Sequence, residues 1–375
     1  MTTLRFSALD TWFFRESRPM EALGGAELAS VFPPPPRTLL GAVRSAIGDA
    51  QGVDWRVFAR DASDPLRALI GFGDDLGPLS LAGPWLSHAG ERLYHIPGLL
   101  LRKGDELIRL RVGGAVRTGM GKILLPELPQ GAQGYKPLDN CWVTGGGLER
   151  ILQGGVPDPD EIRAARDLFQ EEPRLGIALD HRLRTTLEGL LYQTRHLRPC
   201  ADLAVEIEIG LADGTTAPAG LVRLGGEGRM AHVETVATPD PPEAPAADAK
   251  TSGLTLALLT PLHAGTGLDG WLPPGFLPHT ENNTLTWRGE IANIPLTIHS
   301  AILGKAQREG GWDMASHRPR PMQSLIPAGG VYYVTTNTDL ARAIETLHGT
   351  RIGEEADKAL GRGQLACGLW RNNEQ

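Results

Sequence analysis

Two glycine-rich loops combine glycines with an arginine, a pairing that suits the binding of phosphate groups. Glycine permits positive φ and lets backbone N–H groups approach an anion closely, and arginine adds a planar, bidentate donor. The candidate contacts are Gly225, Gly226, Gly228 and Arg229 in the first loop and Gly361, Arg362 and Gly363 in the second. Both sequences are also typical of tight β turns, so either loop alone leaves the two interpretations open.

Basic side chains gather in four further segments, which are candidate RNA contacts. They are Arg15 and Arg18, Arg37 and Arg44, Arg184 and Arg195, and Lys305, Arg308 and Arg318. Proteins neutralise RNA phosphates with local groups of arginine and lysine, although a single group is more often a solvated face. The net charge of −7 is unusual for an RNA-binding protein, but binding depends on the local groups.

Several patterns resemble parts of enzyme sites, and each lacks a component that its chemistry needs. Residues 265–270 match a dinucleotide-binding fingerprint, but Pro273 and Pro274 exclude the helix that should follow. Residues 119–122 lack the first glycine and the final hydroxyl of a phosphate loop. Asp74 and Asp75, in a glycine turn, resemble a two-metal site without a partner carboxylate.

The ten histidines also show no metal-ligand spacing. His196, His299 and His317 each lie near an arginine or lysine in the sequence, which leaves a general base for RNA cleavage as an alternative. We predict no catalytic residue, no metal site and no cofactor.

Length and composition set the wider limits. A chain of 375 residues predicts two domains, and 47 glycines with 29 prolines predict many turns on a strand-based frame. No apolar run is long enough to span a membrane, and the N-terminus lacks a signal-peptide core. Three widely separated cysteines argue against a disulfide framework. We therefore expect a cytoplasmic protein without a membrane partner.

Hydrophobic periodicity indicates the elements that position these residues. The predicted strands lie at 4–14, 175–179, 203–209, 254–258, 294–302, 331–335 and 365–370, and a hairpin at 93–111 turns at 103–105. Helices are predicted after Pro36 with Thr38 as the cap, over 159–170 with Asp158 as the cap, and over 338–348. The proline-rich stretch 238–252 predicts an extended, solvated linker between two domains.

Seven segments together resemble the RAMP superfamily of CRISPR proteins, and specifically the third subunit of type III-B (Cmr) effectors. They lie at 10–20, 33–48, 172–198, 224–229, 310–313, 324–334 and 360–370 and occur in the family's order from end to end. The resemblance implies an α+β chain of two ferredoxin-like (RRM-like) domains, over 1–237 and 253–375. A β-hairpin thumb would be inserted in the first domain at about 90–147.

The same resemblance implies a non-catalytic role in antiviral defence. The subunit would hold the 5′ tag of crRNA with the large polymerase-like subunit, contact the backbone RAMP subunit, and wedge the guide–target duplex with its thumb. Two alternatives stay open. One is a metal-independent RAMP endoribonuclease that processes CRISPR repeats, and the other is the equivalent subunit of a type III-A complex.

Overall fold

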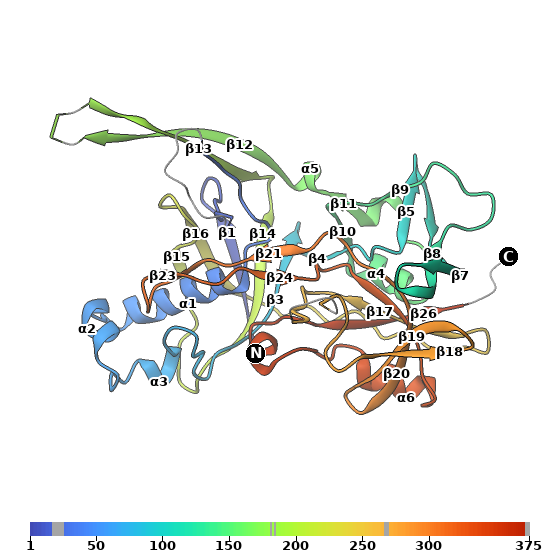
Figure 1. Cartoon of the computed structure of the whole chain (residues 1–375). Coiled ribbons are helices and arrows are strands. Elements are labelled where there is room, and N and C mark those ends of the chain that lie inside the picture. The colour runs from blue at the N-terminus through green and yellow to red at the C-terminus, as the bar shows by residue number, and fades with distance from the viewer. Residues whose placement is uncertain (17–25, 181, 184, 266–269, 372–375) are drawn as a thin grey trace. The chain divides into compact units, whose positions relative to one another are not determined.

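The computed structural model describes residues 1–16, 26–180, 182–183, 185–265 and 270–371. It is a mixed α/β structure, rich in sheet and with few helices (Figure 1). The chain forms two compact units, and each takes its residues from three separate segments. Unit 1 comprises Met1–Gly90, Ala165–Thr238 and Arg308–Gln323, and unit 2 comprises Glu91–Ala164, Pro239–Gln307 and Ser324–Gln375. The sequence-based domains 1–237 and 253–375 therefore each contribute to both units.

Five strands of unit 1 form an antiparallel sheet. Their spatial order is β3 (Ser80–His88), β14 (Leu203–Gly210), β1 (Thr2–Ala8), β16 (Met230–Val236) and β15 (Gly220–Arg223). The strands predicted at the N-terminus and at 203–209 are confirmed, but β1 ends at Ala8. Glu206 of β14 is buried, and Arg5 of β1 donates to its Oε1 from Nε at 3.0 Å and from Nη2 at 2.9 Å.

Helix α1 (Pro36–Ala50) packs on this sheet through β3 and β15. Its buried stripe includes Leu39, Val43 and Ile47, as the periodicity predicted. Thr38 is not the cap, because the helix begins at Pro36, whose fixed φ suits the first turn. Two short helices follow, α2 (Trp55–Arg60) and α3 (Arg67–Ile70).

A long hairpin extends away from the sheet of unit 1 (Figure 1). Its strands are β12 (Phe169–Asp180) and β13 (Thr185–Pro199), and β2 (Ala26–Leu28) pairs in parallel with β13. The helix predicted over 159–170 is wrong. Asp158 does form a capping box, but only with the single turn η1 (Pro159–Glu161), after which β11 (Ile162–Ala164), α5 (Ala165–Leu168) and β12 follow. Pairing with neighbouring strands overrides the local helix signals.

Unit 2 has an antiparallel sheet of six strands. The order is β18 (Leu277–Glu281), β19 (Thr284–Ile291), β20 (Ile294–Ile302), β25 (Val331–Thr335), β17 (Gly253–Leu258) and β26 (Leu365–Trp370). Helix α6 (Leu340–Leu347) packs on it, with Asp339 as the cap, and α7 (Glu355–Ala359) precedes β26. All the elements predicted in this part of the chain are confirmed, although β18, β19 and α7 were not predicted.

The remaining part of unit 2 contains the hairpin predicted at 93–111 and most of the segment at about 90–147 that the resemblance implies as a thumb. The turn at 103–105 is confirmed, but the hairpin is shorter than predicted. It joins β5 (Leu100–Lys103) to β6 (Glu106–Arg109). The start of the predicted hairpin belongs instead to β4 (Glu91–His95), which pairs with β10 (Cys141–Thr144). The chain that follows this hairpin forms β7 (Arg111–Thr118), β8 (Gly121–Glu127), β9 (Lys136–Pro137), β10 and α4 (Gly145–Leu152).

The proline-rich stretch contains no helix or strand between 237 and 252, as predicted. It is not simply solvated, however, because it is bonded along unit 2. His348 Nε2 lies 2.9 Å from the carbonyl of Pro242, and the N–H of Glu243 donates to Glu149. In the part of the chain that the structure describes, no helix is long and apolar enough to cross a membrane.

Candidate nucleic-acid interface

Three arginines converge on Asp10, beside the first glycine loop. Asp10 follows β1, Arg174 lies on β12, Arg198 on β13, and Arg229 ends the loop between β15 and β16. The distances to the Asp10 carboxylate are 3.0 Å from Arg174, 3.1 Å from Arg198 and 3.1 Å from Arg229. Glu172 binds Arg174 and Arg198 at 2.6 and 2.5 Å. These five residues are called the Asp10 cluster.

The electrostatics of the Asp10 cluster favour an anion. Hydrogen bonds, first from Arg174 and then from Arg198, hold the pKa of both Asp10 and Glu172 below the ordinary values, so both carboxylates stay charged. Three guanidiniums then face two carboxylates, which leaves a positive charge. The arginines are partly exposed, and each has more N–H groups than the carboxylates accept. The carboxylates therefore orient arginines that retain donors for a phosphate.

The first glycine loop is held against the chain by its own backbone. Gly225 has φ +97°, and an added Cβ would lie 2.7 Å from the carbonyl oxygen of Phe13. The N–H of Gly226 donates to that same carbonyl at 2.8 Å. By contrast, Gly228 is exposed, and nothing lies near its Cβ position. Close packing on Phe13 thus explains the first two glycines, and the RNA contact expected of them stays a prediction.

His196, one of the histidines considered as a base, lies beneath this loop. Its ring is buried, stacks on Phe13, and places Nδ1 3.1 Å from Thr11 Oγ1. Burial, and then the charges of Arg174 and Arg229, lower its pKa. The histidine is therefore mostly neutral at pH 7, but a substrate has no direct access to it.

A second group of arginines surrounds the glycine turn 71–75. Arg37 binds Asp74 at 2.8 Å, and Arg320 binds both Asp74 and Asp313. Arg44 donates to the carbonyls of Gly73 and Asp75. The two aspartates that resembled a metal site thus serve as an arginine-bound turn, and the described residues contain no group of metal ligands.

The arginines of this group line a cavity of about 580 Å³ in unit 1. Its walls come from α1, α2, residues 70–73, Arg223 and the segment 312–320, which forms the small hairpin β22 (Trp312–Asp313) and β23 (Arg318–Pro319). Apolar and aromatic side chains form most of its surface, with Trp312 at the rim. It is called the Trp312 groove.

The second glycine loop lies in unit 2 and has a different environment. Arg362 is only 1% exposed and binds Asp357 at 2.5 Å. Gly363 has φ +70°, and its N–H donates to Pro261. The loop therefore joins α7 to the start of β26, and its arginine points inward.

The other predicted contacts are dispersed. Arg195 is paired with Glu27 and Glu171, and Arg15 is exposed beside the bridge to Ser30. Lys305, Arg308 and Arg318 are exposed. Arg18 and Arg184 lie outside the described residues.

Sequence reasoning missed Asp10, Glu172 and Arg174, which the hairpin register places together. The charges of Glu172, Arg174 and Arg198 were the available signal, because the pairing of Glu172 with His196 brings Arg198 to the diagonal position across the strands.

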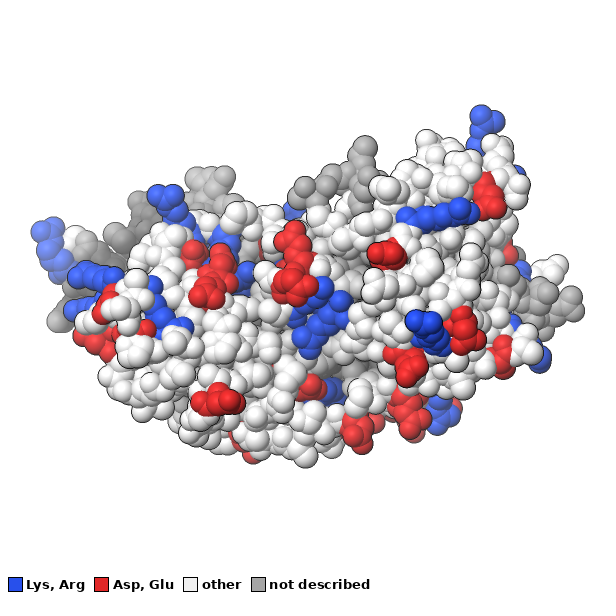
Figure 2. All heavy atoms as spheres, turned by 90° about the horizontal axis from the view of Figure 1, so that it is seen from below, with Lys and Arg blue, Asp and Glu red and all other residues white. Residues whose placement is uncertain are grey.

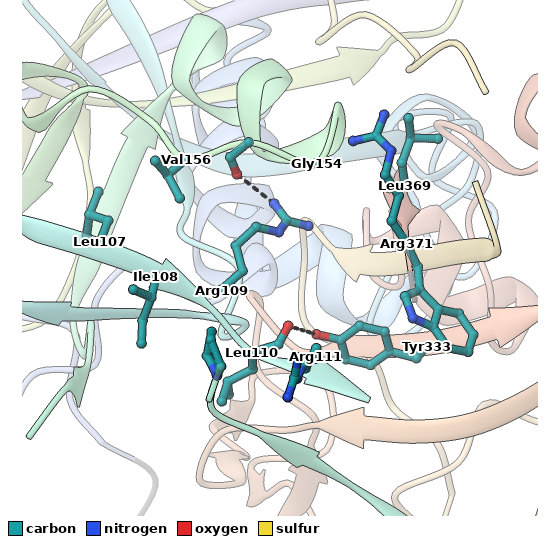
Figure 3. A pocket seen from close by; sticks show the side chains of 13 residues that line it. Leu107, Ile108, Arg109, Leu110, Arg111, Gly154, Val156, Tyr333, Leu369 and Arg371 are labelled. Carbon is teal, nitrogen blue, oxygen red and sulfur yellow. Dashed lines mark hydrogen bonds between the residues drawn. The ribbon is translucent and has the colours of Figure 1, made fainter. Parts of the chain in front are cut away.

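Unit 2 has a cavity of about 380 Å³ in which arginines also gather (Figure 3). Arg109 donates to the carbonyls of Ile151 and Gly155, both at 2.7 Å, at the end of α4. Tyr333 donates to the carbonyl of Leu110 at 2.7 Å, and burial raises its pKa to about 12. Arg371 binds Asp248 at 3.0 Å. The polar groups here bind parts of unit 2 itself, so we assign this cavity a structural role.

The charged side chains on the surface are dispersed, as the predicted RNA contacts are. Figure 2 shows acidic and basic side chains interspersed on one face, without a continuous basic band. A groove that tracks a long nucleic-acid backbone would require such a band. On this face, only local contacts with phosphate groups are therefore expected.

Comparison with known proteins places the chain. A family model described as CRISPR-associated protein (Cas_Cmr3) matches residues 4–370, and no curated protein matches. A chain in the cryo-EM structure of the type III-B Cmr-beta bound to cognate target RNA is 16% identical, with a TM-score of 0.50 over 98% of this chain and 99% of that chain. The two chains share a fold.

Two further structures are similar at lower scores. A chain of the type III-B Cmr-beta bound to cognate target RNA and AMPPnP is 17% identical, with a TM-score of 0.48 over 88% of this chain and 86% of that chain. A chain of the Csm3-Csm4 subcomplex from a type III-A complex is 11% identical, with a TM-score of 0.41 over the full length of both chains.

Proposed function

Because the chain belongs to the Cas_Cmr3 family of CRISPR-associated proteins, we propose that it is a non-catalytic RNA-binding subunit of a type III-B effector complex. It would hold the 5′ tag of crRNA together with the large subunit, contact the backbone subunit, and wedge the guide–target duplex. The Cmr-beta complex that contains the similar chain was solved bound to cognate target RNA, which supports this assignment.

The strand order of the two units supports the expected pair of ferredoxin-like domains. In unit 1, β16, β1, β14 and β3 are the fourth, first, third and second strands of that fold, with α1 after the first strand. In unit 2, β26, β17, β25 and β20 have the same order, with α6 after the third strand. Each unit would then be such a domain with one helix replaced by other structure.

The observation on which the RNA-binding proposal mainly rests is the composition of the β12–β13 hairpin. Its base contains Arg174 and Arg198 of the Asp10 cluster. Beyond them Leu175 and Ile177 are 73% and 52% exposed, although leucine and isoleucine are usually buried. At about 3.3 Å per residue, a strand of this length reaches on the order of 40 Å. A hairpin with cationic residues at its base and apolar residues beyond suits a phosphate grip with a wedge between bases.

This proposal moves the wedge from the segment 90–147 to β12–β13. The predicted segment lies in unit 2, and its β7–β8 hairpin is shorter. We retain the name thumb for β12–β13 only.

The test measures RNA binding and cleavage by the purified chain, with and without the large subunit, on labelled repeat RNA in EDTA. We expect salt-sensitive binding of the 5′ tag without cleavage, because phosphate contacts release counterions. The doubly substituted chain Leu175→Ser, Ile177→Ser should bind the tag normally but no longer unstack a 2-aminopurine placed in a guide–target duplex. Cleavage of the repeat RNA in EDTA by the wild-type chain would contradict the non-catalytic role and favour the endoribonuclease alternative.

A further inference from the structure

The Trp312 groove exposes more apolar surface than a solvated face needs. Trp312 and Met314 are 56% and 73% exposed, and Trp55 of α2, which also lines the groove, is 38% exposed. Phe58 and Leu40 are buried and form part of the lining. Exposed apolar patches around a concave floor are typical of interaction sites, and tryptophan, methionine and arginine are enriched in protein interfaces.

The groove is also formed in advance. Trp55 lies against Gly48, where an added Cβ would meet its ring at 2.5 Å, and its Nε1 donates to Asp49 at 2.8 Å. Ala315 packs against Gly73, with 3.3 Å to the position of a Cβ there. The walls are therefore fixed without a ligand, and binding would require little ordering of the groove.

The charges around the groove suit a protein segment that carries one carboxylate. Arg37 and Arg320 are bound to Asp74 and Asp313, and Arg44 donates to backbone carbonyls of the turn 71–75. Burial lowers the pKa of Arg44 to about 10, so it is still charged at pH 7. Arg223 is exposed and makes no ion pair with any described residue. Asp74 and Asp313 are already paired with Arg37 and Arg320, so Arg223 remains to attract a carboxylate of a protein partner.

We propose that the Trp312 groove docks a segment of a partner protein that presents an apolar side chain next to a carboxylate. The apolar side chain would lie on the floor between Trp55 and Trp312, and the carboxylate would bind Arg223. This surface is separate from the Asp10 cluster and the thumb, so the proposal goes beyond the RNA-binding function.

The test uses photo-crosslinking in the assembled complex, purified through a tag on this chain. Benzoylphenylalanine replaces Trp312 in one sample and Leu277 in the control, an exposed residue on β18 of unit 2. We expect illumination to link position 312 to another protein subunit, at a peptide with aspartate or glutamate beside an apolar residue. A link from 312 to RNA, a link to a second copy of this chain, or no link within an intact complex would each overturn the proposal.

Two substitutions provide an independent measurement of the same contact. Trp312→Ala and Arg223→Glu should each weaken retention of the linked subunit about tenfold or more, as interface anchors do, while the thermal unfolding of the chain stays unchanged. Normal retention in both variants would contradict the proposal. If no other subunit co-purifies with the wild-type chain, the type III-B assignment has failed instead, which distinguishes the two failures.

Discussion

The two glycine-rich loops have similar sequences and opposite environments. Arg229 is 24% exposed and shares Asp10 with two other arginines, whereas Arg362 is 1% exposed and paired with Asp357. Both loops precede a strand and both contain glycines with positive φ. The difference shows that a glycine–arginine motif specifies a backbone shape, and that the surrounding elements decide whether its arginine meets a ligand or the protein interior.

We expect the greatest loss of stability when the buried arginine of the second loop is removed. Arg362→Ala should lower the free energy of unfolding by roughly 3–5 kcal/mol, because Asp357 would be left buried without its main partner. Urea titration of the full chain followed by tryptophan fluorescence measures the loss.

The matched control for this substitution is Lys358→Ala, which breaks a surface pair with the exposed Glu355. It should have little effect on stability. A stable Arg362→Ala chain with weakened RNA affinity would show that the second loop contacts RNA after all.

Removing the exposed arginine should change binding and spare stability. We expect Arg229→Ala to weaken binding of the tag RNA by roughly 1–3 kcal/mol, the range for hydrogen bonds to charged groups, and to reduce the salt dependence. Fluorescence anisotropy at several salt concentrations measures both quantities. Arg288→Ala in unit 2, which breaks an exposed pair with Glu281, serves as the control. Equal affinities for all three chains would contradict a role for the Asp10 cluster.

Within the first loop, replacing Gly228 or Gly225 by alanine should lower the stability of the chain by different amounts. Gly228→Ala should cost about 1 kcal/mol for its positive φ alone, since the space around it is open. Gly225→Ala should cost more, because its Cβ would also meet the carbonyl of Phe13. Thermal unfolding of both variants gives the order, and the reverse order would show that the loop is not packed on Phe13.

The smallest expected effect is the pH dependence of stability that comes from His196. The folded protein lowers the pKa of His196, so below its ordinary value of about 6.5 the unfolded chain binds a proton that the folded chain does not. Stability from this residue is therefore present above pH 6.5 and falls as the pH decreases towards the folded pKa.

His95 and His299 have lowered pKa values too, so the measurement is the difference between the wild type and His196→Gln. We expect that difference to decrease from pH 7 to pH 5.5. A constant difference over this range would mean that His196 titrates normally.

The sequence allowed the strands with the clearest apolar pattern to be predicted, but not most of the other strands, and it indicated few of the long-range contacts. The strands at 254–258, 294–302, 331–335 and 365–370 were clear, because their apolar residues are buried in one sheet. The prediction of a helix at 159–170 was wrong, because Asp158 and Pro159 indicate only where a helix can start. The burial of Arg362 depends on Asp357, and the position of Arg174 depends on hairpin register. Neither dependence is visible in a local pattern.

The segment Arg308–Gln323 completes unit 1, although the residues on both sides of it belong to unit 2. During synthesis, the Trp312 groove therefore lacks one wall until most of unit 2 has left the ribosome, even though domains generally fold in order from the N-terminus. A truncation before residue 308 would remove this wall together with the later strands of unit 2. For this chain, separating the two units requires redesigning the connections, because no single cut leaves either unit whole.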